Sequence, residues 1–202
     1  MSWSRRIRGN IAPLLRKYRN IPASFLEVGV LDGHTARWLL SRILRHPLSR
    51  YYGVDTWSFE TQRRKHFPNN NTGRALFAVM LEKIEQLKRE YPDKCKLIKG
   101  YSADILSRNA MYCGYFADDS LDFVYLDANV ESAFRTMQDF YLSWPLLKTG
   151  GTIVINNNTR KFPECQRAIR FLVDSITGNN GEIVFFNTQL GVRKISNVKQ
   201  IK

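Results

Sequence analysis

Short apolar runs of strand character alternate with helical stretches along this chain, and no other feature constrains its fold as strongly. Seven such runs occupy residues 24–30, 51–54, 96–99, 121–126, 152–155, 182–186 and 191–195. Apolar residues recur at helical spacing over residues 35–44, 74–91, 132–144 and 167–175. Parallel strands need long crossover connections, which are usually helices. We therefore predict an α/β fold with a doubly wound, mostly parallel, Rossmann-like sheet of seven strands, an antiparallel C-terminal hairpin and three αβα layers.

The length of the chain, 202 residues, suits one domain of this class, so we expect a single domain over residues 1–202. Its first 20 residues predict a basic amphipathic helix, in which Ile7, Ile11 and Leu15 share one face and arginines cover the others. We interpret this segment as an opening helix that packs on the domain, because only residues 21–22 separate it from the first strand. An arginine-rich amphipathic N-terminus is also typical of a mitochondrial presequence.

The chain is strongly basic, with a net charge of +13 and a sequence pI near 9.9. Residues 101–150 reverse the sign, with seven acidic against three basic side chains. A basic surface attracts nucleic acid, acidic lipid or an anionic substrate, although solvated surface charge explains the same composition.

The sequence has no apolar stretch long enough for a membrane span, and its three cysteines lack the spacing of a zinc site or a disulfide framework. We expect a soluble intracellular protein in the cytoplasm, with the mitochondrion as the alternative compartment. The oligomeric state is left open.

Polar residues and glycines follow five successive predicted strands. In a doubly wound sheet these carboxyl ends carry the ligand site. The positions are Glu27, Gly29, Gly33, Asp55, Ser102, Ala103, Asp127, Asn156 and Asn157. The first of these loops lacks the three-glycine fingerprint of dinucleotide sites, which disfavours a dehydrogenase.

Five segments in this order, FLEVGVLDGHTARWLL, YYGVDTW, KLIKGYSADIL, LDFVYLD and WPLLKTGGTIVINN, give the chain a recognisable family resemblance. Between about residues 24 and 157 it resembles the class I S-adenosylmethionine-dependent methyltransferases, in particular the small O-methyltransferase-like branch. The final hairpin, with LGVRKI, is similar to the closing strands of that family. The resemblance implies S-adenosylmethionine as cofactor and a methyl acceptor as substrate.

The resemblance also implies roles for individual residues at the strand ends. Glu27 and Gly29 match the positions that hold the methionine portion of the cofactor, and Gly33 matches the glycine that opens the following helix. Asp55 matches the acidic residue that binds the ribose hydroxyls.

Two further strand ends complete the implied cofactor site. Ser102 and Ala103 fall where the family contacts adenine, and Asp127 falls where the family places a carboxylate near the sulfonium. Asp127 is therefore both a cofactor-binding and a catalytic candidate.

Metal-dependent relatives carry an acidic residue after the fifth strand, where this chain has Asn156 and Asn157. A hard cation prefers carboxylate oxygens. We therefore predict no metal site; if a divalent ion bound, its ligands would be Asp127, Asn156 and Asn157.

A polar loop over residues 56–73 is predicted as a lid over the site, because loops at strand ends carry substrate contacts in this architecture. It holds His66, which is the best placed of the three histidines to act as a base, and the basic cluster Arg63, Arg64 and Lys65. A solvated surface loop is the alternative interpretation.

Three functions are compatible with these residues. We favour metal-independent methyl transfer to a small-molecule hydroxyl. The second is a catalytically degenerate binding or assembly subunit that keeps the fold. The third is an RNA or other nucleic-acid methyltransferase that uses the basic surface; against it, no Asn/Asp-Pro-Pro-aromatic motif follows the fourth strand and no lysine adjoins Asp127.

Overall fold

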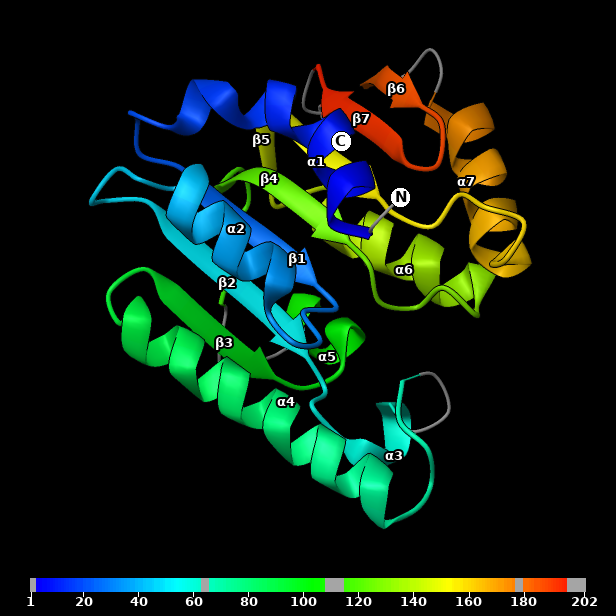
Figure 1. Cartoon of the computed structure of the whole chain (residues 1–202). Helices are drawn as coiled ribbons and strands as arrows, with labels where there is room; N and C mark the ends of the chain where they lie inside the picture. The colour runs from blue at the N-terminus through cyan, green and yellow to red at the C-terminus, as the bar shows by residue number, and fades with distance from the viewer. Residues whose placement is uncertain (1–2, 63–65, 108–114, 177–179, 196–202) are drawn as a thin grey trace. The chain divides into compact units, whose positions relative to one another are not determined.

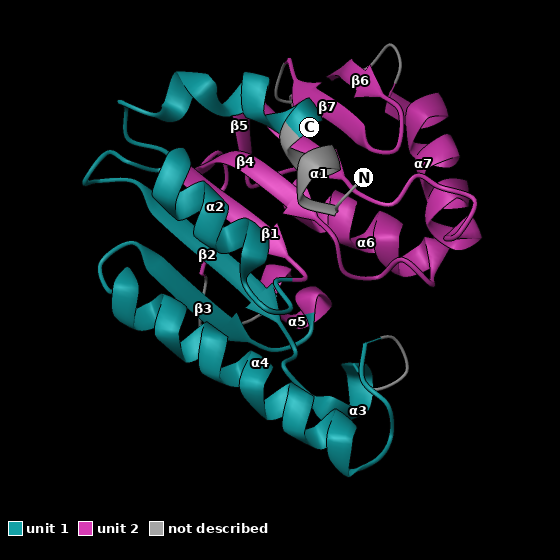
Figure 2. Ribbon diagram, viewed as in Figure 1, with its two compact units in different colours: residues 1–23, 30–101 teal, residues 24–29, 102–202 magenta. Residues whose placement is uncertain are grey.

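The computed structural model describes residues 3–62, 66–107, 115–176 and 180–195, with side chains from residue 9 onward. The chain divides into two compact units, residues 1–23 with 30–101, and residues 24–29 with 102–202 (Figure 2). We call them unit 1 and unit 2. The strand order of the whole sheet is β3-β2-β1-β4-β5-β7-β6.

Unit 1 contains two parallel strands and the helices that flank them in sequence (Figure 1). Its elements are α1 (Trp3–Leu15), η1 (Arg16–Tyr18), α2 (His34–Arg42), β2 (Arg50–Asp55), α3 (Phe59–Gln62), α4 (Asn71–Glu90) and β3 (Cys95–Lys99). β2 and β3 pair in register from Tyr51 opposite Cys95 to Asp55 opposite Lys99. Helix α2 packs on β2 and α4 packs on β3, so both strands bury apolar side chains.

Unit 2 holds the other five strands. Its elements are β1 (Ser24–Val28), α5 (Ser102–Leu106), β4 (Leu121–Leu126), α6 (Ala133–Ser143), β5 (Leu147–Ile155), α7 (Pro163–Ile176), β6 (Gly181–Phe186) and β7 (Leu190–Lys194). β4 pairs in parallel with both β1 and β5, and β7 lies antiparallel between β5 and β6. Helices α6 and α7 pack on each other (Figure 1). The predicted fold class, a mostly parallel sheet with an antiparallel C-terminal end, is confirmed.

β1 and β4 belong to one unit although many residues separate them in sequence. The order of the strands in the sheet reverses between β1 and β4. The strands that follow β1 in sequence, β2 and β3, lie on one side of it, and β4 lies on the other. The ring centroids of Phe25 and Phe123 lie 5.1 Å apart in the buried centre of this pair. The reversal of strand order, the switch point next to which a doubly wound sheet is expected to bind its ligand, therefore lies at the closely packed pair β1 and β4.

Several element boundaries differ from those predicted. Helix α4 begins at Asn71, three residues early, because the Asn70 side chain caps it by accepting from the backbone of Gly73 at 2.9 Å. Strand β5 begins at Leu147 and continues through Gly150, whose φ of +82° only glycine adopts without strain. Helix α3 falls in the segment predicted as a polar loop, and α5 follows β3 where no helix was predicted.

The N-terminal segment forms a helix, as predicted, but the regular α-helix ends at Leu15 and continues as the short η1. Ile11, Leu15 and Tyr18 are buried, so the apolar side of this segment is covered by other parts of the chain. The side chain of Ile7 lies outside the described residues. Within the described ranges, no helix has the length and apolar character needed to cross a membrane.

Candidate functional site

The carboxylate of Asp127 lies directly after β4 and is held by two amide side chains from the end of β5. Its Oδ1 accepts hydrogen bonds from Nδ2 of Asn156 at 3.0 Å and from Nδ2 of Asn157 at 2.7 Å. Its backbone N–H donates to the carbonyl of Val28 at 2.8 Å. In the part of the chain that the structure describes, Oδ2 has no hydrogen-bond partner. One oxygen is therefore fixed and the other is available.

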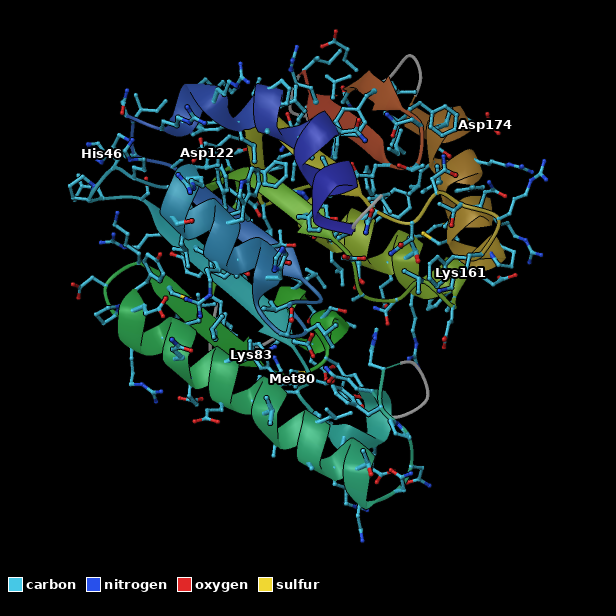
Figure 3. All side chains as sticks on the ribbon, in the orientation of Figure 1. His46, Met80, Lys83, Asp122, Lys161 and Asp174 are labelled. Carbon is cyan, nitrogen blue, oxygen red and sulfur yellow. The ribbon has the colours of Figure 1, made fainter. Side chains whose placement is uncertain are left out.

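Burial governs the protonation of Asp127. Asp127 is half-buried, and this partial removal from water raises its pKa from 3.8 to about 7, while the two amide hydrogen bonds lower it by less. Asp122, labelled in Figure 3, is a useful contrast at the other end of β4, because its carboxylate accepts from Lys148 Nζ at 2.9 Å and from the backbone of Ser24. The same strand thus carries an ion-paired structural carboxylate and a carboxylate that titrates near neutral pH.

A buried polar chain fixes the orientation of Asn156. Nε2 of Gln189 donates to Oδ1 of Asn156 at 3.1 Å and lies 3.4 Å from the hydroxyl of Tyr125. Burial raises the pKa of Tyr125 well above its usual value, and the charges of Asp127 and Glu27 raise it further. Because Gln189 occupies the Asn156 carbonyl, the amide N–H group of Asn156 faces Asp127.

Asn157 adopts a left-handed backbone conformation with φ of +67°. Such a conformation is uncommon for residues other than glycine, although asparagine tolerates it better than most. Strained residues of this kind cluster at functional sites. Here the conformation accompanies the short hydrogen bond to Asp127.

The approach of β1 to β4 explains the glycine after β1. Gly29 has φ of +91°, and a Cβ at this position would lie 2.7 Å from the carbonyl carbon and oxygen of Asp127. Glu27, two residues earlier, is buried and pairs in register with Tyr125. The structure therefore brings Glu27, Gly29 and Asp127 together at one end of unit 2.

Helix α5 connects to the loop after β4 through Asn129. Nδ2 of Asn129 donates to Oδ2 of Asp139 at 2.7 Å and to Oγ of Ser102 at 3.3 Å. Asp139 is buried in α6, and burial raises its pKa. Ser102 and Ala103, both half-buried, occupy the first turn of α5.

In unit 1, Asp55 at the end of β2 organises the loop between β1 and α2. Its Oδ2 accepts from the backbone N–H of Leu31 at 3.0 Å, and its Oδ1 accepts from the backbone N–H of Trp57 at 2.9 Å and from Nε2 of Gln62 at 2.8 Å. Nε1 of Trp57 donates back to the Leu31 carbonyl at 3.1 Å.

The residues that Asp55 holds are themselves strained. Leu31 and Trp57 have φ of +51° and +38°. The carboxylate therefore stabilises two backbone conformations that would otherwise be unfavourable. A structural role for Asp55 is established by these contacts, whereas its contact with a ribose stays a prediction.

Gly33 opens α2 with φ of +77°, as its position before a helix suggests. A Cβ at Gly33 would meet Ile84 and Leu87 of α4, both at 3.3 Å. The close neighbour on that side is thus α4. A contact between Gly33 and a cofactor stays a prediction.

The described parts of the predicted lid loop pack against α4. Residues 59–62 form α3, and the ring of Phe77 on α4 packs edge-on against Phe59 and Phe67, with centroids 5.6 Å apart in each case. His66 is exposed, and its backbone N–H donates to Gln62. Residues 63–65, the basic cluster of this loop, lie outside the described residues.

Three partners of the site were not predicted from the sequence: Gln62, Asn129 and Gln189. Each lies in a loop or a short helix. No spacing links Gln189 to Asn156, or Gln62 to Asp55. Only the side-chain contacts of the folded chain reveal them.

The arrangement around Asp127 does not suit a hard cation. Amide N–H groups face the carboxylate, the Asn156 carbonyl is already an acceptor for Gln189, and carboxylate oxygens are scarce. Among the described residues there is no group of three or more His, Cys, Asp or Glu side chains that could hold a metal ion. Two of the cysteines, Cys95 and Cys165, are buried and form no disulfide, and Cys113 lies outside the described ranges.

The sequence matches a known protein family. A protein-family model described as "Methyltransferase domain" matches residues 26–158, well over half of the chain. No curated protein sequence gives a significant match.

Solved structures of methyltransferases share the fold at low sequence identity. They include the apo structure of CalS11, a TDP-rhamnose 3'-O-methyltransferase (16% identity, TM-score 0.59, covering 96% of this chain and 81% of that one). The O-methyltransferase NovP matches with 14% identity and a TM-score of 0.57, over 95% and 79% of the two chains. A methyltransferase from Geobacter sulfurreducens matches with 15% identity and a TM-score of 0.58, over 93% and 78%. With its strand order, its switch point and the matching family model, the chain belongs to the class I S-adenosylmethionine-dependent methyltransferases.

Proposed function

We propose that this methyltransferase modifies a hydroxyl group of a small molecule without a metal ion, and that Asp127 faces the acceptor. The observation that carries this proposal is the environment of Asp127. Two amides hold Oδ1, Oδ2 has no partner within the described residues, and the pKa is about 7. A carboxylate with a pKa near the working pH is ionised in a large fraction of the molecules. It is also basic enough to accept a proton from a hydroxyl group.

S-adenosylmethionine supplies an electrophilic methyl group on a positively charged sulfonium. In this chain the residues proposed to hold it are those found at the strand ends: Glu27, Gly29, Gly33, Asp55, Ser102, Ala103 and Asp127. Asp55 Oδ2 accepts one backbone N–H, which leaves an acceptor position for a ribose hydroxyl. The ionised form of Asp127 would attract a sulfonium, and the two amide hydrogen bonds to Oδ1 hold the carboxylate in place.

Metal independence is supported by the donor set. Asn156 and Asn157 present N–H groups to Asp127, where a metal-dependent site would present oxygen atoms. These N–H groups point the positive ends of neutral amide dipoles at the carboxylate.

The lid loop remains a proposal for acceptor binding. Phe59 and Phe67 of this loop pack on Phe77 of α4, and the exposed His66 directly precedes Phe67. We propose that residues 56–73 contact the acceptor, and that His66→Ala raises KM for the acceptor more than it lowers cofactor affinity.

The decisive experiment measures cofactor binding and turnover separately. Calorimetry with S-adenosylmethionine and with S-adenosylhomocysteine should give binding that EDTA and Mg²⁺ leave unchanged. Formation of S-adenosylhomocysteine is then followed with phenolic, sugar and nucleotide-sugar hydroxyl acceptors, with Asp127→Asn as the matched variant. The sugar-nucleotide acceptors are included because CalS11, which shares the fold, is a TDP-rhamnose 3'-O-methyltransferase.

Each outcome assigns a function. Turnover that Asp127→Asn lowers at least 100-fold, with cofactor still bound, supports the proposal. Binding without turnover on any hydroxyl favours the degenerate binding subunit. Turnover that requires Mg²⁺ would contradict the metal-free site, and turnover on RNA alone would favour the nucleic-acid enzyme.

A further inference from the structure

Two helices of unit 1 line one groove with arginines. Along α2, His34, Arg37, Trp38 and Arg42 share one helical face, and Arg16 and Arg19 of η1 and its C-cap lie across from them. The groove encloses about 500 Å³. Helices α1 and α2, from which it is built, are seen in Figure 1.

Three of the four arginines that line this groove have no acidic partner among the described residues. Arg37 forms an ion pair with Glu90 of α4. For Arg16, Arg19 and Arg42, the described residues provide no carboxylate within ion-pair distance. The sequence explains why, since no acidic residue precedes Glu27.

Positive charges gathered in a concave site repel one another and focus the field on whatever enters it. A solvated basic surface spreads its charges over a convex face, where each is hydrated separately. Here burial of Ile11, Leu15 and Tyr18 fixes the basic side of the N-terminal segment opposite the basic side of α2. The resulting repulsion is relieved when an anion enters.

The side chains in the groove also indicate the chemistry of that anion. The guanidinium fork of arginine matches the oxygens of a phosphate with two parallel hydrogen bonds. Trp38, half-buried at the same groove, offers an aromatic face on which a base can stack. A lipid surface is a poorer partner, because membrane-binding helices present protruding apolar side chains to a flat interface.

We propose that the groove between the N-terminal segment and α2 binds a nucleotide, with its phosphate on Arg16, Arg19 and Arg42 and its base against Trp38. The nucleotide is either free or part of a single-stranded RNA, since both present the same phosphate and base. This site goes beyond the proposed methyl transfer and does not depend on it.

The test uses the full chain and a fluorescein-labelled 12-nucleotide single-stranded RNA, with binding followed by anisotropy. R16A/R19A/R42A is compared with R45A/R89A/R170A, which removes the same charge from exposed positions outside the groove. The groove variant should bind at least tenfold more weakly, and the control should stay within threefold of wild type. The slope of log K against log salt should fall by roughly 0.7 for each phosphate that the variant no longer neutralises.

Competition with AMP separates the two sources of the ligand. Displacement of RNA by micromolar AMP assigns the groove to a free nucleotide, whereas displacement only by RNA assigns it to a strand. Trp38→Leu should weaken AMP binding at least fivefold and leave binding of inorganic pyrophosphate unchanged. R16K/R19K/R42K keeps the charge, so it serves if the alanine variant does not fold, and it should bind at least threefold more weakly because lysine has no guanidinium fork.

Several results would overturn the proposal. One is an equal loss in the control variant, which would mean diffuse surface charge. Another is displacement of RNA by polyglutamate as readily as by RNA. A third is binding to vesicles of anionic lipid with no binding to either RNA or AMP.

Discussion

Asn157 donates its side-chain amide to Asp127 across 2.7 Å while holding a left-handed backbone with φ of +67°. The conformation costs about 1–2 kcal/mol for a residue other than glycine. The hydrogen bond to a charged acceptor returns about 1.5–3 kcal/mol. The strained backbone is therefore tied to the carboxylate that we propose to be catalytic, and this pair gives the first prediction.

Replacing Asn157 by glycine removes the amide and relieves the backbone at the same time. The pKa of Asp127 should rise further, because only one of the two hydrogen bonds that lower it remains. Stability should change by less than about 1 kcal/mol, since the relief of strain offsets the missing bond. Asn157→Ala keeps the strain and is the control. Urea unfolding and the pH profile of methyl transfer measure the two effects, and an unchanged pH profile would contradict the role of the amide.

The raised pKa of Asp127 makes the stability of the protein depend on pH. Between about pH 4 and pH 7 the folded chain binds a proton that the unfolded chain has released, because the pKa is 3.8 unfolded and about 7 folded. The free energy of unfolding should thus fall as pH rises through this window, by up to roughly 1.4 kcal/mol per pH unit, and level off above it.

Asp127→Asn is the matched variant for this dependence, because it cannot titrate. The difference in unfolding free energy between wild type and Asp127→Asn, measured with urea from pH 4 to 8, should favour wild type most at low pH. A difference that is constant with pH would show that Asp127 titrates at its ordinary value. If Asp127 is the base, activity should increase over the same range, opposite to stability.

Gly29 is predicted to tolerate no side chain. Gly29→Ala strains a φ of +91° and places Cβ 2.7 Å from backbone atoms of Asp127, which cannot move independently of β4. We expect a loss of roughly 2–5 kcal/mol of unfolding free energy. Gly150→Ala is a close control, because its φ is +82° but nothing lies within 4 Å of its Cβ. Gly150→Ala should lower the free energy of unfolding by about 1–2 kcal/mol. Equal losses in the two variants would mean that the contact between the new Cβ and the Asp127 backbone does not destabilise the fold.

Substitutions of Asp55 and Gln62 should change cofactor affinity in opposite directions. Asparagine has one side-chain oxygen in place of two, so Asp55→Asn leaves one of the two backbone N–H groups without its acceptor. We expect S-adenosylmethionine affinity to fall at least tenfold and the free energy of unfolding to fall by roughly 1–3 kcal/mol. Gln62→Met frees an acceptor position on Asp55 and also removes the buried Oε1 of Gln62, which has no partner among the described residues.

For Gln62→Met we expect affinity to rise severalfold with little change in thermal midpoint. Calorimetry with S-adenosylmethionine and thermal unfolding measure both quantities. A loss of affinity in this variant would mean that Gln62 supports the cofactor-binding form of Asp55 rather than competing with a ribose hydroxyl.

The sequence by itself determined the fold class and most of the strands. The run 121–126 became β4 without a change of boundary, because a short run that is apolar except for Asp122 is typical of a strand buried in a parallel sheet. The sequence also placed Glu27, Gly29, Asp55 and Asp127 at the carboxyl ends of strands, where a doubly wound sheet carries its ligand site.

Tertiary structure decided what those residues touch. Asp55 holds Leu31 and Trp57, and Gly33 faces α4, because loop backbones and long-range packing follow no sequence period. The groove of arginines exists only because the fold brings η1 and α2, each with arginines on one side, to the same groove. The neutral amides of Asn156 and Asn157 were visible in the sequence. The N–H group of Asn156 faces Asp127 because Gln189, which precedes β7, occupies its carbonyl in the folded chain. Local sequence patterns determine helices and strands. The direction of a buried polar side chain depends on hydrogen-bond partners that are distant in sequence and that only the folded chain brings near.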